Sequence, residues 1–213
     1  MKMFKLKHII YILLAALFVS LLFAIDFSFF SKTSADGYDL SSHNRNLNWK
    51  KLSKSQFVYL KATEGSDFTD KKYRSYIQKA RENNLIVGAY HFMCNDCTGK
   101  KQFNHFRNVV GKDIDLIPVL DVEISGISNN NILEFVSECE KYYGVKPLIY
   151  INYYNRIKYY SAIKNCKIWL SNKTPFKPLC DYVIEQYAIE EIDGVEIDHN
   201  RINPKYTIKD FTL

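Results

Sequence analysis

Eight short apolar segments, separated by polar or amphipathic stretches, constrain the fold of this chain more than any other feature. They have the length of β-strands, and several are nearly continuous runs of β-branched and aromatic residues. The predicted strands span residues 37–41, 57–62, 85–92, 116–122, 146–152, 167–171, 182–187 and 195–200. Strands that are apolar on both faces indicate a mainly parallel sheet that is covered on its outside.

Amphipathic segments between these strands predict helices. Residues 69–84, 99–111 and 130–144 each place apolar side chains on one face, and residues 153–162 predict a shorter helix. The connections among the last three strands are too short for full helices. We therefore expect an α/β barrel of eight mainly parallel strands with fewer helices than strands. An open doubly wound sheet is the alternative, although no glycine-rich phosphate loop follows the first strand.

The first 35 residues differ in composition from the rest of the chain. Lys2, Lys5 and Lys7 precede an apolar run at residues 9–25, which fits a signal-anchor or a signal peptide. A poor cleavage signal favours an uncleaved transmembrane anchor with a short tether, and a buried core helix is the alternative. With either leader, residues 36–213 form one exported domain. It would lie in the periplasm or at the cell surface on its membrane anchor, or be secreted if the leader is cleaved.

The charge of the chain does not indicate a nucleic-acid partner. The formal net charge is +6, but several lysines lie in the leader. From residue 36 onward there are 25 basic and 22 acidic residues, a net charge of +3 with no dense basic stripe. We expect a monomer that binds no nucleic acid.

Polar and acidic side chains gather where the predicted strands end. In a (β/α) barrel, the C-terminal ends of the strands carry the chemistry. Residues i and i+2 of a strand point to the same face, so Asp121 and Glu123 in "PVLDVE" should project together. The first and last strands are neighbours in a closed barrel and would bring Asp39 and Asp198 to the same place. The full set at these ends is Asp39, Glu64, Tyr90, His91, Asp121, Glu123, Tyr150, Gln186 and Asp198. Among them, we expect His91 to be a hydrogen-bonded wall residue rather than a catalyst.

Four carboxylates at one mouth repel each other and raise at least one pKa. That leaves a protonated acid beside ionised partners, which is the equipment of glycoside hydrolysis. The alternative interpretation makes each acid a helix cap or a solvated loop residue.

Seven segments in series resemble glycoside hydrolase family 25, the muramidases or lysozymes of the N,O-diacetylmuramidase type. The segments are "GYDLSSHN…NW", "VYLKATEG", "VGAYHF", "PVLDVE", "KPLIYIN", "EQY" and "VEIDHN". The resemblance covers residues 37–203 and implies an irregular TIM-like (β/α) barrel that cleaves peptidoglycan glycan strands without a cofactor or metal. It implies that Glu123 is the general acid and Asp121 its essential neighbour, with Asp39 and Asp198 completing the catalytic set. Departures are Glu185 where a tryptophan is frequent, His199 where an apolar residue is common, and the "MCNDC" loop.

The implied roles leave several choices open. Asp121 would stay ionised and stabilise positive charge at the anomeric carbon, or orient the substrate's acetamido group. Candidate sugar contacts are Tyr90, Tyr150 and Gln186, with barrel packing as the alternative. Glu64 would touch substrate or hold a tyrosine or lysine. Two rival functions are a chitinase-like glycosidase and a catalytically inactive wall-binding protein.

The chain has five cysteines, and export would permit disulfides. Cys166 and Cys180 each precede a predicted strand, and these strands are neighbours, so we predict a disulfide between them. Cys94 and Cys97 could close a small loop or, with nearby histidines, form a zinc site. Cys139 remains as the unpaired thiol.

Overall fold

The computed structural model describes residues 36–174 and 176–213. The predicted leader and tether lie outside these residues. Within them, no helix has the length and apolar character that a bilayer crossing requires.

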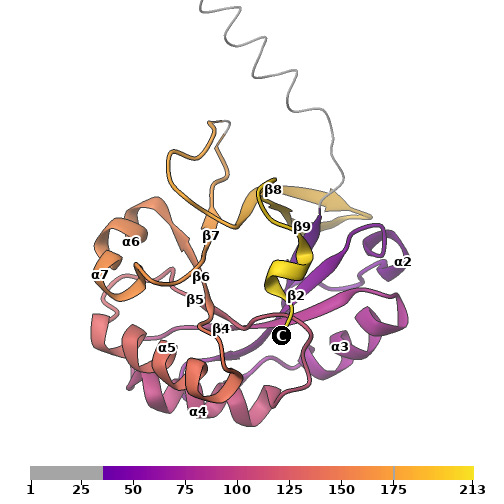
Figure 1. Cartoon of the computed structure of the whole chain (residues 1–213). Coiled ribbons are helices and arrows are strands. Elements are labelled where there is room, and N and C mark those ends of the chain that lie inside the picture. The colour runs from indigo at the N-terminus through magenta and orange to yellow at the C-terminus, as the bar shows by residue number, and fades with distance from the viewer. Residues whose placement is uncertain (1–35, 175) are drawn as a thin grey trace, which may run out of the picture. The chain divides into compact units, whose positions relative to one another are not determined.

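Eight strands close into a barrel, as the apolar segments predict (Figure 1). β1 pairs in parallel with β2 on one side and antiparallel with β9 on the other, which completes the circle. The barrel strands are β1 (Gly37–Leu40), β2 (Phe57–Glu64), β4 (Ile86–Phe92), β5 (Val119–Asp121), β6 (Leu148–Asn152), β7 (Ile168–Ser171), β8 (Ile184–Ile192) and β9 (Val195–Ile202).

The direction of β9 differs from its neighbours. β8 and β9 form an antiparallel hairpin, whereas β1, β2 and β4 to β8 run parallel to one another. We expected Asp198 at the C-terminal end of a parallel strand, and this expectation is wrong. Asp198 lies within β9, directly opposite Asp39 of β1 in the strand register. The antiparallel direction still brings it to the same rim.

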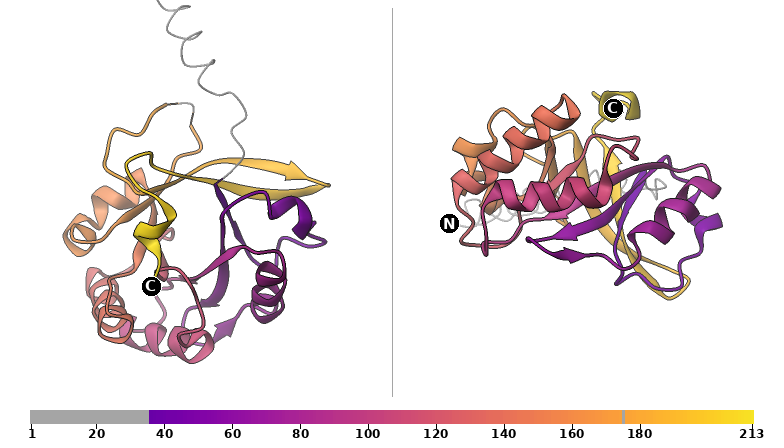
Figure 2. Two further views of the ribbon diagram at one scale, coloured as in Figure 1. Left: turned by 45° about the vertical axis from the view of Figure 1, so that its right-hand side comes forward. Right: turned by 90° about the horizontal axis from the view of Figure 1, so that it is seen from below.

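Six α-helices accompany the strands in the part of the chain described here, fewer than the strand number, as predicted. Figure 2 shows them arranged around the barrel. They are α2 (Trp49–Leu52), α3 (Tyr73–Glu82), α4 (Gly99–Val110), α5 (Asn129–Tyr143), α6 (Tyr153–Lys158) and α7 (Tyr160–Ile163), with a short 3-10 helix at Ile208–Phe211.

The helix predicted at 69–84 begins later, at Tyr73. Residues Phe68–Thr69 instead form β3, a short strand that pairs with the end of β2. Asp70 then makes a buried turn, in which its carboxylate accepts hydrogen bonds from the backbone N–H groups of Ser42 and Lys72. This turn fixes the loop after β1 against the start of α3, next to the barrel mouth.

Two apolar clusters hold the barrel together. One fills its interior with large side chains, among them Tyr59, Trp169 and Phe211. The other lies between strands and helices and includes the fully buried Phe103, Phe106 and Phe135. Because the interior cluster fills the barrel, only the rim at the strand ends is left open for chemistry.

Cys166 and Cys180 are both free thiols, so the structure does not contain the predicted disulfide. Cys166 precedes β7 and interacts with Cys139 of α5. The segment after β7 carries Cys180 to the side of Tyr153, at the start of α6. The pairing of β7 with β8 therefore does not bring the two preceding segments together.

Candidate functional site

A pocket of about 200 Å³ opens at the mouth of the barrel. It gathers side chains from all eight barrel strands and from some of the loops that follow them. Seven of the predicted site residues line it: Asp39, Tyr90, Asp121, Glu123, Tyr150, Gln186 and Asp198. Glu64 is not among the lining residues. The four acids thus share one site, although the outermost two, Asp39 and Asp198, are more than 150 positions apart in the sequence.

Asp39 is held by two side-chain amides. Its Oδ2 accepts hydrogen bonds from Asn200 Nδ2 at 2.8 Å and from Gln186 Nε2 at 3.2 Å. Burial and, next, the charge of Asp198 raise the pKa of Asp39 to about 7. Asp39 is therefore a group that exchanges a proton near neutral pH.

The side-chain amides of Asn200 and Gln186, which hold Asp39, are themselves fixed by hydrogen bonds from two aromatic residues. The Trp169 indole N–H donates to Asn200 Oδ1 at 3.0 Å, and the Tyr150 hydroxyl donates to Gln186 Oε1 at 2.9 Å. These bonds leave each amide N–H₂ aimed at Asp39. Two buried aromatic residues thus determine the orientation of the carboxylate.

Asp121 and Glu123 differ sharply in exposure. Asp121 is only 7% exposed, and its Oδ1 is buried without a hydrogen-bond partner. Burial raises the pKa of Asp121 well above its ordinary value, and the charges of Glu123 and Asp39 add to the shift. Glu123 is exposed at the mouth. The burial and the unpartnered oxygen of Asp121 both favour its protonated form more than in an ordinary aspartate. The ionised state of Asp121 during catalysis stays a prediction.

The backbone at Glu123 is fixed by α6. The side chain of Asn155, which is buried, donates to the carbonyl oxygens of Val122 at 3.2 Å and Glu123 at 2.7 Å. The ladder between β5 and β6 continues one residue further, since Val122 N–H donates to the Tyr150 carbonyl. Glu123 is therefore exposed on a firmly held backbone.

Asp198 is paired with a lysine that the sequence did not single out. Lys173 Nζ, on the loop after β7, lies 3.6 Å from Asp198 Oδ1 and also lines the pocket. Burial raises the pKa of Asp198, while the charge of Lys173 opposes the shift. The acid next to Asp39 is thus partly neutralised by a cation at the rim.

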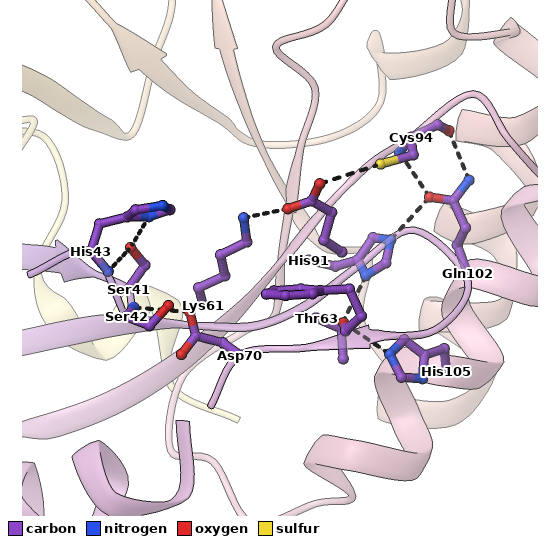
Figure 3. Close-up of polar contacts among 12 residues, drawn as sticks. Ser41, Ser42, His43, Lys61, Thr63, Asp70, His91, Cys94, Gln102 and His105 are labelled. Carbon is purple, nitrogen blue, oxygen red and sulfur yellow. Dashed lines mark hydrogen bonds and ion pairs between the residues drawn. The ribbon is translucent and has the colours of Figure 1, made fainter. Parts of the chain in front are cut away.

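Glu64 does not line the pocket but holds a lysine, one of the two roles considered for it. It accepts a hydrogen bond from Lys61 Nζ at 2.6 Å (Figure 3). Lys61 lines the pocket, and its Nζ also lies 4.7 Å from the centre of the Phe92 ring. Glu64 therefore positions a pocket cation and is not itself a lining residue.

His91 lies outside the pocket, between the strands and the helices. It is fully buried and bonds to Thr63 Oγ1 at 2.8 Å and Gln102 Oε1 at 3.1 Å (Figure 3). Its ring also stacks on Phe135. Burial lowers its pKa to about 3, so the ring stays neutral. Over residues 36–174 and 176–213, no cluster of three His, Cys, Asp or Glu side chains could hold a metal ion.

Several pocket residues escaped the sequence-based analysis: Ser41, His43, Lys61, Phe92, Trp169 and Lys173, with Asn200 behind Asp39. The signal for Asn200 was present, because it stands two residues after Asp198 and must share its face of the strand. No comparable spacing marks Lys173, whose loop has no regular structure.

The family model for Glycosyl hydrolases family 25 matches residues 38–178, about two thirds of the chain. This chain belongs to glycosyl hydrolases family 25. The matched range contains Asp39, Asp121 and Glu123. It ends before Asp198 and before the hairpin of β8 and β9.

Several known proteins are similar to this chain in sequence or in structure. An autolytic lysozyme of Clostridium acetobutylicum is 30% identical over 164 residues, which cover 71% of this chain and 50% of that protein. Lysozyme M1 of Streptomyces globisporus is 24% identical, covering 68% of this chain and 54% of that protein. The structure of a family 25 glycosyl hydrolase from Bacillus anthracis superposes with a TM-score of 0.69 at 29% identity, covering 79% of this chain and 89% of that one. The chain spans about half the length of the first two relatives.

Proposed function

We propose that this family 25 protein is a muramidase that hydrolyses the β-1,4 bond between N-acetylmuramic acid and N-acetylglucosamine in peptidoglycan. The observation that carries the proposal is the convergence of Asp39, Asp121, Glu123 and Asp198 on one pocket. Glycoside hydrolysis needs a proton donor for the leaving oxygen and a carboxylate beside the anomeric carbon. The names of the matched lysozymes support peptidoglycan as the substrate.

In this proposal, Asp121 and Glu123 share one proton. We assign this proton to Asp121 in the free protein, because burial raises the pKa of Asp121 well above its ordinary value. A bound glycan would cover the exposed Glu123 and remove its water, which favours the neutral form of that acid as well. The proton then moves to Glu123, which donates it to the leaving oxygen. Asp121 is left as the carboxylate that stabilises positive charge at the anomeric carbon or orients the substrate's acetamido group.

The remaining lining groups suit a sugar. Tyr90, Tyr150, Phe92 and Trp169 offer aromatic faces to the apolar side of a pyranose ring, and Gln186 offers an amide. Asp39, with its pKa near neutral, and Asp198 would hold the hydrolytic water and accept its proton. These roles account for the polar and aromatic composition of the pocket.

We also propose that the domain acts outside the cytoplasm. Its substrate lies there, and the apolar run at residues 9–25 after three lysines has the pattern of an export signal or anchor. Separating the cells into membrane and soluble fractions, followed by N-terminal sequencing of the exported form, distinguishes the uncleaved anchor from the cleaved leader.

The direct test of the activity is Glu123→Gln in the full chain. Release of reducing ends from purified peptidoglycan should fall by about 10²–10⁴-fold, because the variant has no proton to donate. Thermal unfolding should be unchanged, since the side chain is exposed. Glu196→Gln, an exposed glutamate of β9, is the matched control and should retain full activity.

The products separate the competing functions. Mass spectrometry should find muropeptides that end in N-acetylmuramic acid. Release of chitin oligomers from chitin at a comparable rate would favour a chitinase-like enzyme. Near-wild-type turnover of Glu123→Gln would refute the acid assignment, and binding to cell walls without any cleavage by the wild type would indicate an inactive wall-binding protein.

A further inference from the structure

Exposed apolar side chains concentrate in one part of the barrel. Leu179 is 98% exposed, Ile157 77%, Tyr154 71%, Phe176 70% and Tyr160 58%. We call these five residues the 154–179 patch. They come from α6, the start of α7 and the loop after β7. Large apolar side chains that gather on one exposed surface of a soluble domain mark a contact site.

The parts of the 154–179 patch are joined. Tyr154 and Ile157 are three positions apart on α6 and so share a helix face. The loop after β7 is tied to this helix, because the backbone N–H of Leu179 donates to the Tyr153 hydroxyl at 3.0 Å. Figures 1 and 2 both show the loop and the two helices on the same side of the barrel.

The charge around the patch is of one sign. Residues 153–180 contain six Lys or Arg residues and no Asp or Glu. Lys158 and Lys177 are exposed next to the patch residues in sequence, and Arg156 is partly exposed. By contrast, the exposed end of the β8–β9 hairpin carries Glu190, Glu191 and Glu196. The net charge of +3 over the domain is thus unevenly distributed, with the apolar surface in its basic part.

We propose that the 154–179 patch docks on an anionic lipid surface. Exposed aromatic and aliphatic side chains interleaved with lysine and arginine are the pattern of segments that lie in a membrane interface. The apolar groups enter the boundary between headgroups and acyl chains, and the cations contact lipid phosphates. A phosphate-bearing wall polymer would satisfy the cations but gives no reason to expose Leu179 and Ile157. The docking is separate from any span at residues 9–25 and from the muramidase activity.

The test uses the full chain in phosphatidylcholine vesicles, with and without phosphatidylglycerol, and a photoreactive lipid whose crosslinks are mapped by mass spectrometry. We expect crosslinks at 154–163 and 176–180 that depend on phosphatidylglycerol and decline with salt. The double variant Ile157→Ser with Leu179→Ser should reduce the crosslink yield on the order of tenfold or more. The loss of one buried apolar side chain already weakens affinity by about tenfold. Leu133→Ser, on α5 and 46% exposed, is the matched control and should not change them.

Charge is tested separately. Lys158→Gln with Lys177→Gln should abolish the dependence on phosphatidylglycerol, whereas Lys50→Gln with Lys54→Gln, exposed near α2, should preserve it. All four double or single variants should cleave soluble glycan at the wild-type rate. Crosslinks that are equal in both vesicle types, or spread over other faces, would overturn the proposal. So would shielding of the same residues by peptidoglycan fragments without vesicles, which would assign the patch to the glycan.

Discussion

The two sides of the barrel are built differently. The barrel strands β2, β4, β5, β6 and β7 run parallel, and helices α3 to α7 occur in the connections between them. From β8 to β9 the chain reverses in a two-residue turn, Asp193 and Gly194, both with positive φ. The first side is closed by apolar packing between strands and helices. The second side has a hairpin where the first has helices, so other interactions must stabilise it.

Buried polar groups show the difference most clearly. On the helix-covered side, His91 is buried neutral among Phe106 and Phe135. On the hairpin side, Glu185 is fully buried and is bonded to Arg201 Nε at 2.8 Å and to Asn172 Nδ2 at 2.7 Å. Aromatic packing stabilises one side, and a charge pair with an amide stabilises the other.

The same contrast extends into the pocket. Asp121, on the helix-covered side, is buried with an oxygen that lacks a partner. Asp39, whose partners come from β8 and β9, accepts bonds from two amides. Packing thus places one acid, whereas a hydrogen-bond network places the other, and substitutions on the two sides should have different signatures.

The largest effect on stability is expected from Phe135→Ala on the helix-covered side. Phe135 is fully buried and contacts His91 and Phe103. Its truncation should reduce the free energy of unfolding by about 3–5 kcal/mol, as is typical for buried phenylalanine. Urea denaturation measures this loss. The control is Leu133→Ala at a half-exposed position of the same helix, which should lose about 0.5 kcal/mol of unfolding free energy or less. A loss under about 1 kcal/mol for Phe135→Ala would contradict a packed aromatic core on this side.

The second prediction concerns pH and Asp39→Asn. The pKa of Asp39 is about 7 in the folded protein and about 4 in an unfolded chain, so the folded state keeps a proton that the unfolded state loses. Raising the pH from about 4 to about 7 therefore costs the wild type up to ~4 kcal/mol of stability, and Asp39→Asn should not pay this cost.

The stability of both proteins from about pH 4 to about pH 8 measures the difference, and the exposed Asp67→Asn serves as the control. His91 acts in the opposite sense, because its lowered pKa makes the folded protein lose stability as the pH falls below about 6.5. A constant difference between wild type and Asp39→Asn at all pH values would rule out a raised pKa at Asp39.

The smallest effect is expected from Arg201→Met on the hairpin side. It leaves the buried Glu185 without its cation, but Asn172 remains and Arg201 is about a third exposed. We expect a loss of about 1–3 kcal/mol, less than for a fully buried pair. Combining it with Glu185→Gln should recover part of this loss, because no charge is then stranded. A double variant as unstable as the sum of the two single variants would show that the pair is not what stabilises this side.

The strands and most helices were predictable because their apolar patterns are long and regular. Strand direction was not, since the alternation of apolar residues along β9 is the same whichever way it runs. The four-residue helix α2 and the two-residue strand β3 are too short to show a period. The leader remains a prediction.

In the site, Asp39, Asp121 and Glu123 were predictable because they lie at or just after the ends of apolar strands, whereas Asp198 lies within β9. The groups that position these acids were not predictable. Glu185, which departs from the family pattern, lies fully buried beside Gln186 and pairs with Arg201 of β9. Lys173 depends on the path of an irregular loop. The raised pKa of Asp121 depends on its burial, which the D-x-E spacing does not reveal.

The hydrogen bond between Asp39 and Asn200 joins positions 161 residues apart. During synthesis, a growing chain presents Asp39 long before the strand that orients it has left the ribosome. An incomplete polypeptide can thus contain the Asp121 and Glu123 pair and still lack a finished rim. Because of this sequence separation, the carboxylate set is not assembled before β9 has been synthesised.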